Sequence, residues 1–303
     1  MVCPPKLKSL YQIRSISLPI QSHPTTFRIE EELHKLKKWE ASSSTTAMGE
    51  KISSGMLGLK ELYKCLDELL NLPLTRKSLS LHRYERWIEE SLDTSVTLLD
   101  VCSVTRDLAS QTKEHVKDLQ SAIRRNNKGA PNIQSSAAKY LFFRKEMKKG
   151  AKKLSANAKQ IDNKIPSTPL FEQNDSRYVL TVIRVLREVD SVSISVYDLV
   201  LLFLSEPITK PKSKCWSKLL DHCGEACEGE KEDRRNELQR VDAALNNILR
   251  CGGSSEEEGE SMRIAKEGLE QLQARIESIE NGLECLFKGL IKARTSLLNI
   301  MSL

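Results

Sequence analysis

Residues 262–300 read MRIAKEGLEQLQARIESIENGLECLFKGLIKARTSLLNI. Apolar residues recur along this stretch at alternating spacings of three and four: Met262, Ala265, Leu269, Leu272, Ile276, Ile279, Leu283, Leu286, Leu290, Ala293, Leu297 and Ile300. This heptad pattern predicts one long, coiled-coil-like helix with a narrow apolar seam that packs along other helices. We assign the helix-packing contacts to Leu269, Leu272, Ile276, Ile279, Leu283, Leu286, Leu290 and Leu297.

The residues just before the first position of each heptad are mostly small. They are Ser261, Gly268, Arg275, Gly282, Gly289 and Ser296. A two-stranded zipper normally carries charged residues at this position, where they select its partner. Small residues instead let another helix approach closely. Glycine inside a helix lowers helix stability by about 1 kcal/mol relative to alanine, so three glycines here suggest a packing role. These small residues therefore predict that the apolar seam packs against helices of the same chain.

The remainder of the chain is also typical of helices. The 303 residues include 39% hydrophobic and 29% charged residues, only 5% aromatic residues, and few Gly and Pro. We predict an all-α fold, an elongated antiparallel helical bundle of long helices that ends in the heptad helix. Apolar periodicity places the earlier helices at about 26–40, 49–70, 78–125, 132–163, 175–205 and 232–249, with a short helix at 215–222.

Breaks in the pattern give the expected domain organisation. Residues 1–24 contain several prolines and basic residues and are expected to form an irregular leader. Residues 25–303 are expected to form a single helical-bundle domain, with linkers near 41–48, 126–131, 206–213 and 251–260.

The small net charge of +6 hides an uneven distribution. Between Arg124 and Lys164, twelve Lys and Arg residues stand against two acids, whereas seventeen acids stand against eight basic residues between Asp221 and Glu284. Either the two regions face each other in the fold, or the basic region meets an anionic partner outside it.

Helix 132–163 carries the best candidate for a binding site. Its projection gathers basic residues of the segment 139–153 on one side: Arg144, Lys145, Lys148, Lys149, Lys152 and Lys153. These side chains either pair with acidic helices of the bundle or bind an anionic membrane surface. Nucleic acid is a weaker alternative, since no base-stacking aromatic residues or known reader motif accompany them.

Catalytic and metal-binding patterns are not apparent. The sequence has no GxGxxG, GxxxxGK[ST], HExxH or GxSxG motif, so we expect no enzyme activity, no cofactor and no small-molecule substrate. His115 lies near the apolar face of its helix and is interpreted as a packing residue. A zinc site built from Cys215, His222, Cys223, Cys227 and Cys251 is disfavoured by the ligand spacing. The eight cysteines are expected to be reduced.

We expect a cytoplasmic location. The stretch 179–204 is apolar, but several charges interrupt it, so it is interpreted as a buried bundle helix and not as a membrane span. The Ser-rich basic leader leaves a plastid or mitochondrial transit peptide as an alternative, and the basic helix leaves peripheral membrane association.

Several segments resemble one plant-specific family, the Bypass-like proteins. The run Ile279–Ile300 is similar to the end of that family, and Arg14–Pro19 with Ser22-His23-Pro24 is similar to its N-terminal signature. Further resemblance lies in Leu69–Pro73, Leu98–Asp100 and Ala122–Arg125, so it spans nearly the whole chain. Two mild departures are Lys288 and Thr295, where the family usually carries Arg and Val.

The resemblance implies a helical protein without known enzyme activity, linked to root and shoot development in plants. It supplies no catalytic or ligand residues to transfer to this sequence. We therefore expect an interaction or regulatory protein that acts through helical surfaces on protein partners. The alternative is a peripheral membrane protein that uses the basic helix.

Overall fold

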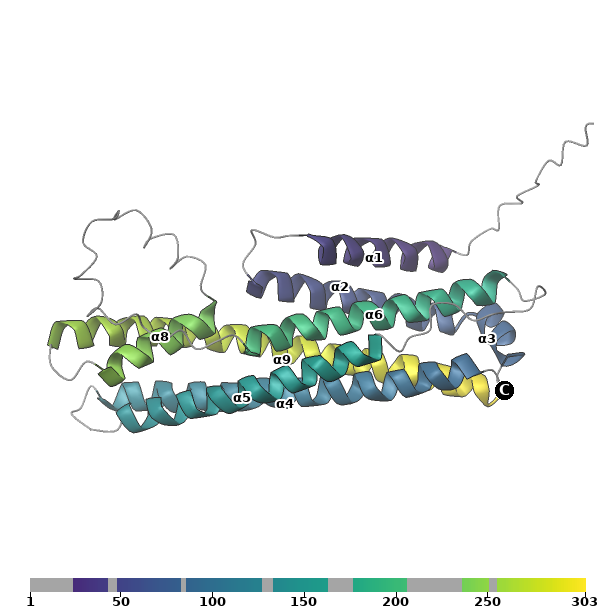
Figure 1. Cartoon of the computed structure of the whole chain (residues 1–303). Coiled ribbons are helices and arrows are strands. Elements are labelled where there is room, and N and C mark those ends of the chain that lie inside the picture. The colour runs from purple at the N-terminus through teal and green to yellow at the C-terminus, as the bar shows by residue number, and fades with distance from the viewer. Residues whose placement is uncertain are drawn as a thin grey trace, which may run out of the picture.

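The computed structural model describes residues 24–42, 48–82, 86–126, 133–162, 177–205, 236–250 and 255–303. Figure 1 shows the helices of these residues side by side in an elongated bundle, and no strand occurs among them. The helices are α1 (Pro24–Ala41), α2 (Met48–Leu70), α3 (Pro73–Ser80), α4 (Arg86–Asn126), α5 (Ile133–Asp162), α6 (Arg177–Ser205), α8 (Glu237–Arg250) and α9 (Ser255–Met301). The predicted all-α fold is confirmed.

Two predicted boundaries are wrong. The helix expected at 78–125 is divided, since α3 ends at Ser80 and α4 begins at Arg86. No Pro or Gly marks this break, and the apolar period continues across it, although Leu81 is 78% exposed. The linker expected at 251–260 is also too long, because α9 already begins at Ser255.

Several other predictions lie outside the described residues. They concern the leader up to residue 23, the short helix at 215–222, and the linker residues 43–47, 127–131, 206–213 and 251–254.

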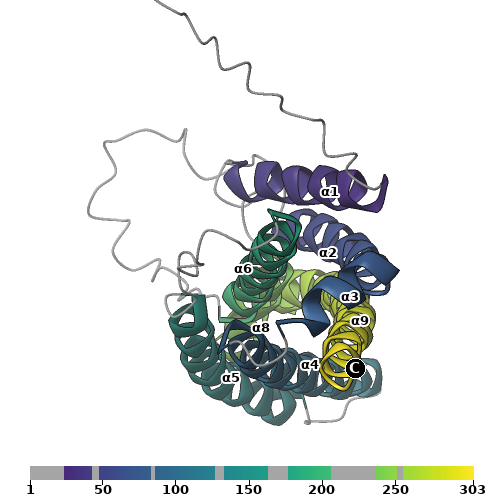
Figure 2. The ribbon, with the colours of Figure 1, turned by 90° about the vertical axis from the view of Figure 1, so that its right-hand side faces the viewer.

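Helix α9 lies along one side of the bundle and packs along α2, α4 and α8 (Figure 2). It runs antiparallel to α4, as the ion pairs Arg106–Glu284 and Lys113–Glu280 show. It runs parallel to α2, because Gly282 contacts Met56 and Gly289 contacts Tyr63. The bundle therefore combines antiparallel neighbours with parallel ones, and α1 also runs parallel to α6, because Glu30 pairs with Arg184 and Lys37 pairs with Glu188.

The heptad seam is part of the core. All eight residues assigned to helix packing are buried, with at most 5% of any side chain exposed: Leu269, Leu272, Ile276, Ile279, Leu283, Leu286, Leu290 and Leu297. They belong to one continuous apolar cluster with buried residues of the other helices. Burial of such side chains contributes about 1.5–3 kcal/mol each, so the seam is a major source of stability.

The small residues beside the seam are positions of close helix approach. A Cβ atom at Gly282 would lie 2.8 Å from Sδ of Met56, and one at Gly268 would lie 3.2 Å from a methyl group of Val241. Ser296 is buried, and its hydroxyl accepts a hydrogen bond from Asn71 at 3.3 Å. These contacts join α9 to α2 and α8 of the same chain, as the sequence predicted.

Helix α6 is the apolar stretch that was interpreted as a buried bundle helix. It packs against α1, α2, α3, α4 and α5, and its apolar side is buried. Among the described helices none is both long enough and apolar enough to cross a membrane.

Candidate interaction surface on helix α5

Helix α5 has a buried side and a cationic side. Its buried residues follow a helical spacing: Ile133, Ala137, Tyr140, Arg144, Met147, Ala151 and Ala158. They face α4 and α6, against which α5 packs (Figure 2). The cationic side is turned outward, so the helix has the amphipathic character expected from its sequence.

Most of the predicted basic site lies on the surface. Lys145, Lys149, Lys152 and Lys153 are exposed, and Lys148 is half-buried. Lys149 pairs with Glu146 one turn away at 2.9 Å, in an exposed ion pair of small energetic value. Within the described part of the chain, the other four lysines form no ion pair. Their charges are therefore available to an external anion.

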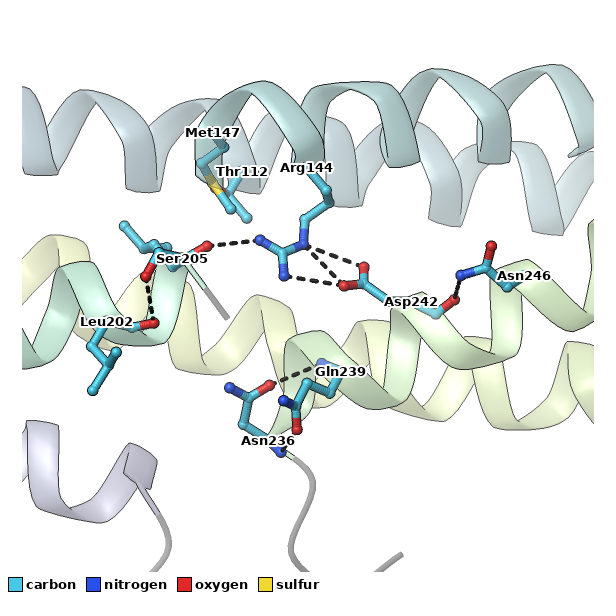
Figure 3. Close-up of polar contacts among 10 residues, drawn as sticks. Thr112, Arg144, Met147, Leu202, Ser205, Asn236, Gln239, Asp242 and Asn246 are labelled. Atoms are coloured by element: carbon cyan, nitrogen blue, oxygen red, sulfur yellow. Dashed lines mark hydrogen bonds and ion pairs between the residues drawn. The ribbon is translucent and has the colours of Figure 1, made fainter. Parts of the chain in front are cut away.

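The assignment of Arg144 to this surface is wrong. Arg144 is fully buried, and its side chain reaches Asp242 of α8 (Figure 3). Nη2 donates to Oδ2 of Asp242 at 3.1 Å, and Nε lies 3.3 Å from both carboxylate oxygens. Nη1 donates to the carbonyl oxygen of Leu204, near the end of α6, at 2.8 Å. One guanidinium thus ties α5 to both α6 and α8.

One buried ion pair links the two regions of opposite charge within the chain. Among the described residues, Arg144–Asp242 is the only ion pair between the basic stretch 124–164 and the acidic stretch 221–284. Within the part of the chain that the structure describes, this buried pair links the two stretches, and the exposed lysines lie outside it.

The helical spacing contained the signal for Arg144. It lies four residues after Tyr140 and three before Met147, on the same side of the helix as both. Asp242 likewise lies between Val241 and Leu245 on the apolar side of α8. The neighbouring lysines hide this pattern, because a run of basic residues resembles a solvated face.

Burial changes the acid–base properties of this site. Desolvation raises the pKa of Asp242, although the Arg144 guanidinium counteracts the shift. Burial also raises the pKa of Tyr140 well above its ordinary value, and the charge of Asp242 adds to this effect. We interpret the pair as a structural contact that holds α5 in place, because both charged groups are closed off from solvent.

Asp190 of α6 is a second acid with a perturbed environment. Burial raises the pKa of its carboxyl to about 8, and its charge acts on the nearby Tyr63. No basic side chain among the described residues forms an ion pair with it.

We expect Asp190→Asn to stabilise the folded chain at high pH. An unfolded aspartate has a pKa of about 3.9, so between about pH 4 and pH 8 the folded state keeps a proton that the unfolded state loses. The stability from Asp190 is therefore fully present below about pH 4 and is lost as the pH rises through about 8. At pH 8 the variant should gain at least about 1 kcal/mol in free energy of unfolding.

Urea unfolding at about pH 5 and about pH 9 measures this difference. Asp198→Asn is the matched control on the same helix, because Asp198 pairs with Lys159 at 3.0 Å and its loss should bring no gain. An Asp190→Asn variant with the pH dependence of the wild type would contradict the assignment.

Of the other residues that the sequence analysis considered, only some belong to the part of the chain that the structure describes. The candidate zinc ligands Cys215, His222, Cys223, Cys227 and Cys251 lie outside the described residues. The described residues contain no group of three or more potential metal ligands. His115 stacks on Phe143 with ring centroids 4.0 Å apart, in agreement with its interpretation as a packing residue.

In comparisons with known proteins, one family model matches the chain. The family model described as Protein BPS1 matches residues 55–300, which include most of α2 and all later helices. Neither the curated proteins nor the solved structures give a match to the chain. The family match covers far more than half of the sequence and includes the heptad helix and the basic helix. The chain therefore belongs to the Protein BPS1, or Bypass-like, family.

Proposed function

We propose that this chain is a non-enzymatic regulatory protein of root and shoot development that acts by binding protein partners. Membership of the Bypass-like family supports a regulatory role in plant development at the family level. The observation that carries the binding proposal is the exposed lysine row of α5, comprising Lys145, Lys149, Lys152 and Lys153. The buried Arg144–Asp242 contact fixes the helix that presents this row. A fixed cationic surface binds an anionic partner with a smaller loss of conformational entropy than a mobile one.

Affinity purification of a tagged chain from plant tissue tests this proposal. The test variant carries glutamate at the four exposed lysines of α5: Lys145, Lys149, Lys152 and Lys153. The matched control reverses four exposed lysines on α2 and α9: Lys60, Lys64, Lys266 and Lys292. We expect partners that the control retains and the α5 variant loses. Turnover of a metabolite by the purified chain, without any partner, would contradict the proposal.

An anionic membrane surface is the second candidate for the same face. Phe142 is 68% exposed and lies on the same side of α5 as Lys145 and Lys149. An exposed aromatic residue among lysines is typical of helices that lie on anionic lipid. In fractionated cells we expect the tagged chain in the cytoplasm if proteins are its partners, and with membranes if lipids are.

Flotation with vesicles that contain anionic lipid measures the membrane alternative. Each lysine near such a surface contributes about 1 kcal/mol, so reversal of all four should reduce partitioning at least about a hundredfold. The control reversal on α2 and α9 should have little effect. Equal flotation of both variants would exclude lipid binding by this face.

A further inference from the structure

Helices α4 and α9 carry exposed apolar side chains close to the line along which they meet. The two helices pack side by side over much of their length (Figure 1). Within the described part of the chain, no third helix packs extensively against both. Val96 of α4 and Ile291 and Leu298 of α9 are 40%, 43% and 44% exposed. Exposed apolar residues that gather on one face mark an interaction site, whereas scattered ones do not.

The two α9 residues lie at the outer edge of the contact with α4. Glu284, Ile291 and Leu298 follow one another at intervals of seven, so they share one side of α9. Glu284 pairs with Arg106 of α4, which shows that this side is the one next to α4. The residues that directly precede Ile291 and Leu298 in the sequence are buried in the core. The exposed pair therefore lies on the solvent side of the α4–α9 contact.

Val96 reaches the same edge from α4. It follows Ser95, which is buried in the contact and whose hydroxyl accepts a hydrogen bond from Arg294 of α9 at 2.7 Å. The core-facing side of α4 is buried, so the exposed Val96 lies on the solvent side. Because α4 and α9 run antiparallel, the ion pairs between them place Val96 level with Arg294. Val96 therefore lies between Ile291 and Leu298, about 5 Å from each along the helix axis.

An acidic row, made of Asp93, Asp100 and Asp107, borders these apolar residues on α4. Asp93 lies three residues before Val96 and Asp100 four residues after it, so both neighbour Val96 on the helix surface. Asp107 continues the row at the next interval of seven. All three acids are exposed, and none forms an ion pair within the described residues.

The basic residues of the same region do not neutralise the acidic row. Arg106 and Lys288 both pair with Glu284. The Arg294 guanidinium donates its hydrogen bonds to uncharged oxygen atoms of α4. Lys292 is exposed, but it follows Ile291 directly and so lies about 100° further round α9, away from α4. A partner at this face therefore meets an excess of negative charge beside the apolar residues.

We propose that this outer α4–α9 face, formed by Val96, Ile291, Leu298 and the acidic row, binds a basic amphipathic helix of a partner protein. Such a helix places apolar residues one and two turns apart on a patch of this kind. Lysine or arginine residues along its edge would meet the acidic row, which is the charge complementarity that selects a basic partner. The same acids repel anionic lipid, so a membrane does not fit this face. The α5 lysines require an anionic partner, so the two surfaces bind different molecules.

Fluorescence anisotropy with the full-length chain and a labelled synthetic helix tests this binding. The peptide has about 21 residues in heptads, with leucine at the first and fourth positions, lysine at the fifth and seventh, and alanine elsewhere. A control peptide has the same composition in an order that forms no apolar stripe. We expect the amphipathic peptide to bind more tightly than the control peptide, and salt to weaken its binding, because exposed charges are screened.

Three variants of the chain separate binding at this face from general attraction. Neutralisation of the acidic row should raise the dissociation constant about tenfold: Asp93→Asn, Asp100→Asn and Asp107→Asn. Removal of the apolar residues should raise it at least as much, since their area is no longer covered: Val96→Ser, Ile291→Ser and Leu298→Ser. The matched control neutralises three exposed acids of other surfaces and should leave it unchanged: Glu31→Gln, Glu50→Gln and Glu270→Gln.

Circular dichroism distinguishes lost binding from lost folding, because all three variants change exposed residues and should keep the helix content of the wild type. Equal binding of both peptides, or an equal loss in the control variant, would overturn the proposal. So would a wild type that binds neither peptide, as expected if a second copy of the chain or another segment of the same chain covered this face. Reversal of the α5 lysines should not weaken peptide binding, so this proposal and the proposed function can fail separately.

Discussion

Asp242→Ala is expected to lower the free energy of unfolding by about 3–5 kcal/mol, because it leaves the Arg144 guanidinium buried without its counter-ion. Both side chains of this pair are fully buried, so water cannot replace the lost carboxylate. Conversion of both residues to apolar ones of similar size, as in Arg144→Met with Asp242→Leu, should restore most of the stability. Removal of one partner is therefore expected to lower the stability of the fold more than replacement of both.

Urea unfolding followed by circular dichroism measures both variants. Arg184→Ala is the matched control, because Arg184 pairs with Glu30 and Glu188 at the surface, where such pairs contribute about 0.2–1 kcal/mol. The interpretation of Arg144 as a structural residue is contradicted if Asp242→Ala and Arg184→Ala destabilise the chain equally.

Gly289→Leu is expected to destabilise the chain by about 2–3 kcal/mol, through overpacking between α9 and α2. A Cβ atom at this position would lie 2.9 Å from Cβ and 3.1 Å from Cγ of Tyr63. The tyrosine has little freedom to move away, because its hydroxyl hydrogen-bonds with Ser193 of α6 at 2.8 Å. The clash therefore pushes α9 away from α2 and outweighs the gain in helix propensity.

The control for this prediction is another helical glycine. No atom lies within 4 Å of the position that a Cβ atom at Gly150 would occupy. Gly150→Ala should stabilise α5 by about 0.5–1 kcal/mol, since alanine favours the helix. If Gly289→Leu also stabilised the chain, the close packing of α9 on α2 would be disproved.

The sequence predicted features that depend on regular spacing. The heptad seam and the small residues beside it are local patterns, and the buried Leu283 and the Gly282–Met56 contact agree with them. The division between α3 and α4 could not be predicted in this way, because no Pro or Gly interrupts the period there. The end of α3 coincides with a change in burial, with Leu79 buried and Leu81 exposed.

The candidate site was predicted only in part. Lysines at regular helical spacing are correctly placed on the surface, because their charge and length favour solvent. Arg144 is the exception, since its burial depends on Asp242 about a hundred residues away. The spacing of Tyr140, Arg144 and Met147 indicates the buried side of the helix, but it does not reveal a partner so distant. The raised pKa of Asp190 has the same origin, because it arises from helices that pack around it.

We propose that the exposed lysines of α5 perform the function while the buried Arg144 beside them maintains the structure. Rescue of plants that lack this chain tests that claim most directly. The chain with glutamate at Lys145, Lys149, Lys152 and Lys153 should accumulate to the wild-type level yet fail to restore root and shoot growth. The control with reversed Lys60, Lys64, Lys266 and Lys292 should restore it. Full rescue by the α5 variant would contradict the account.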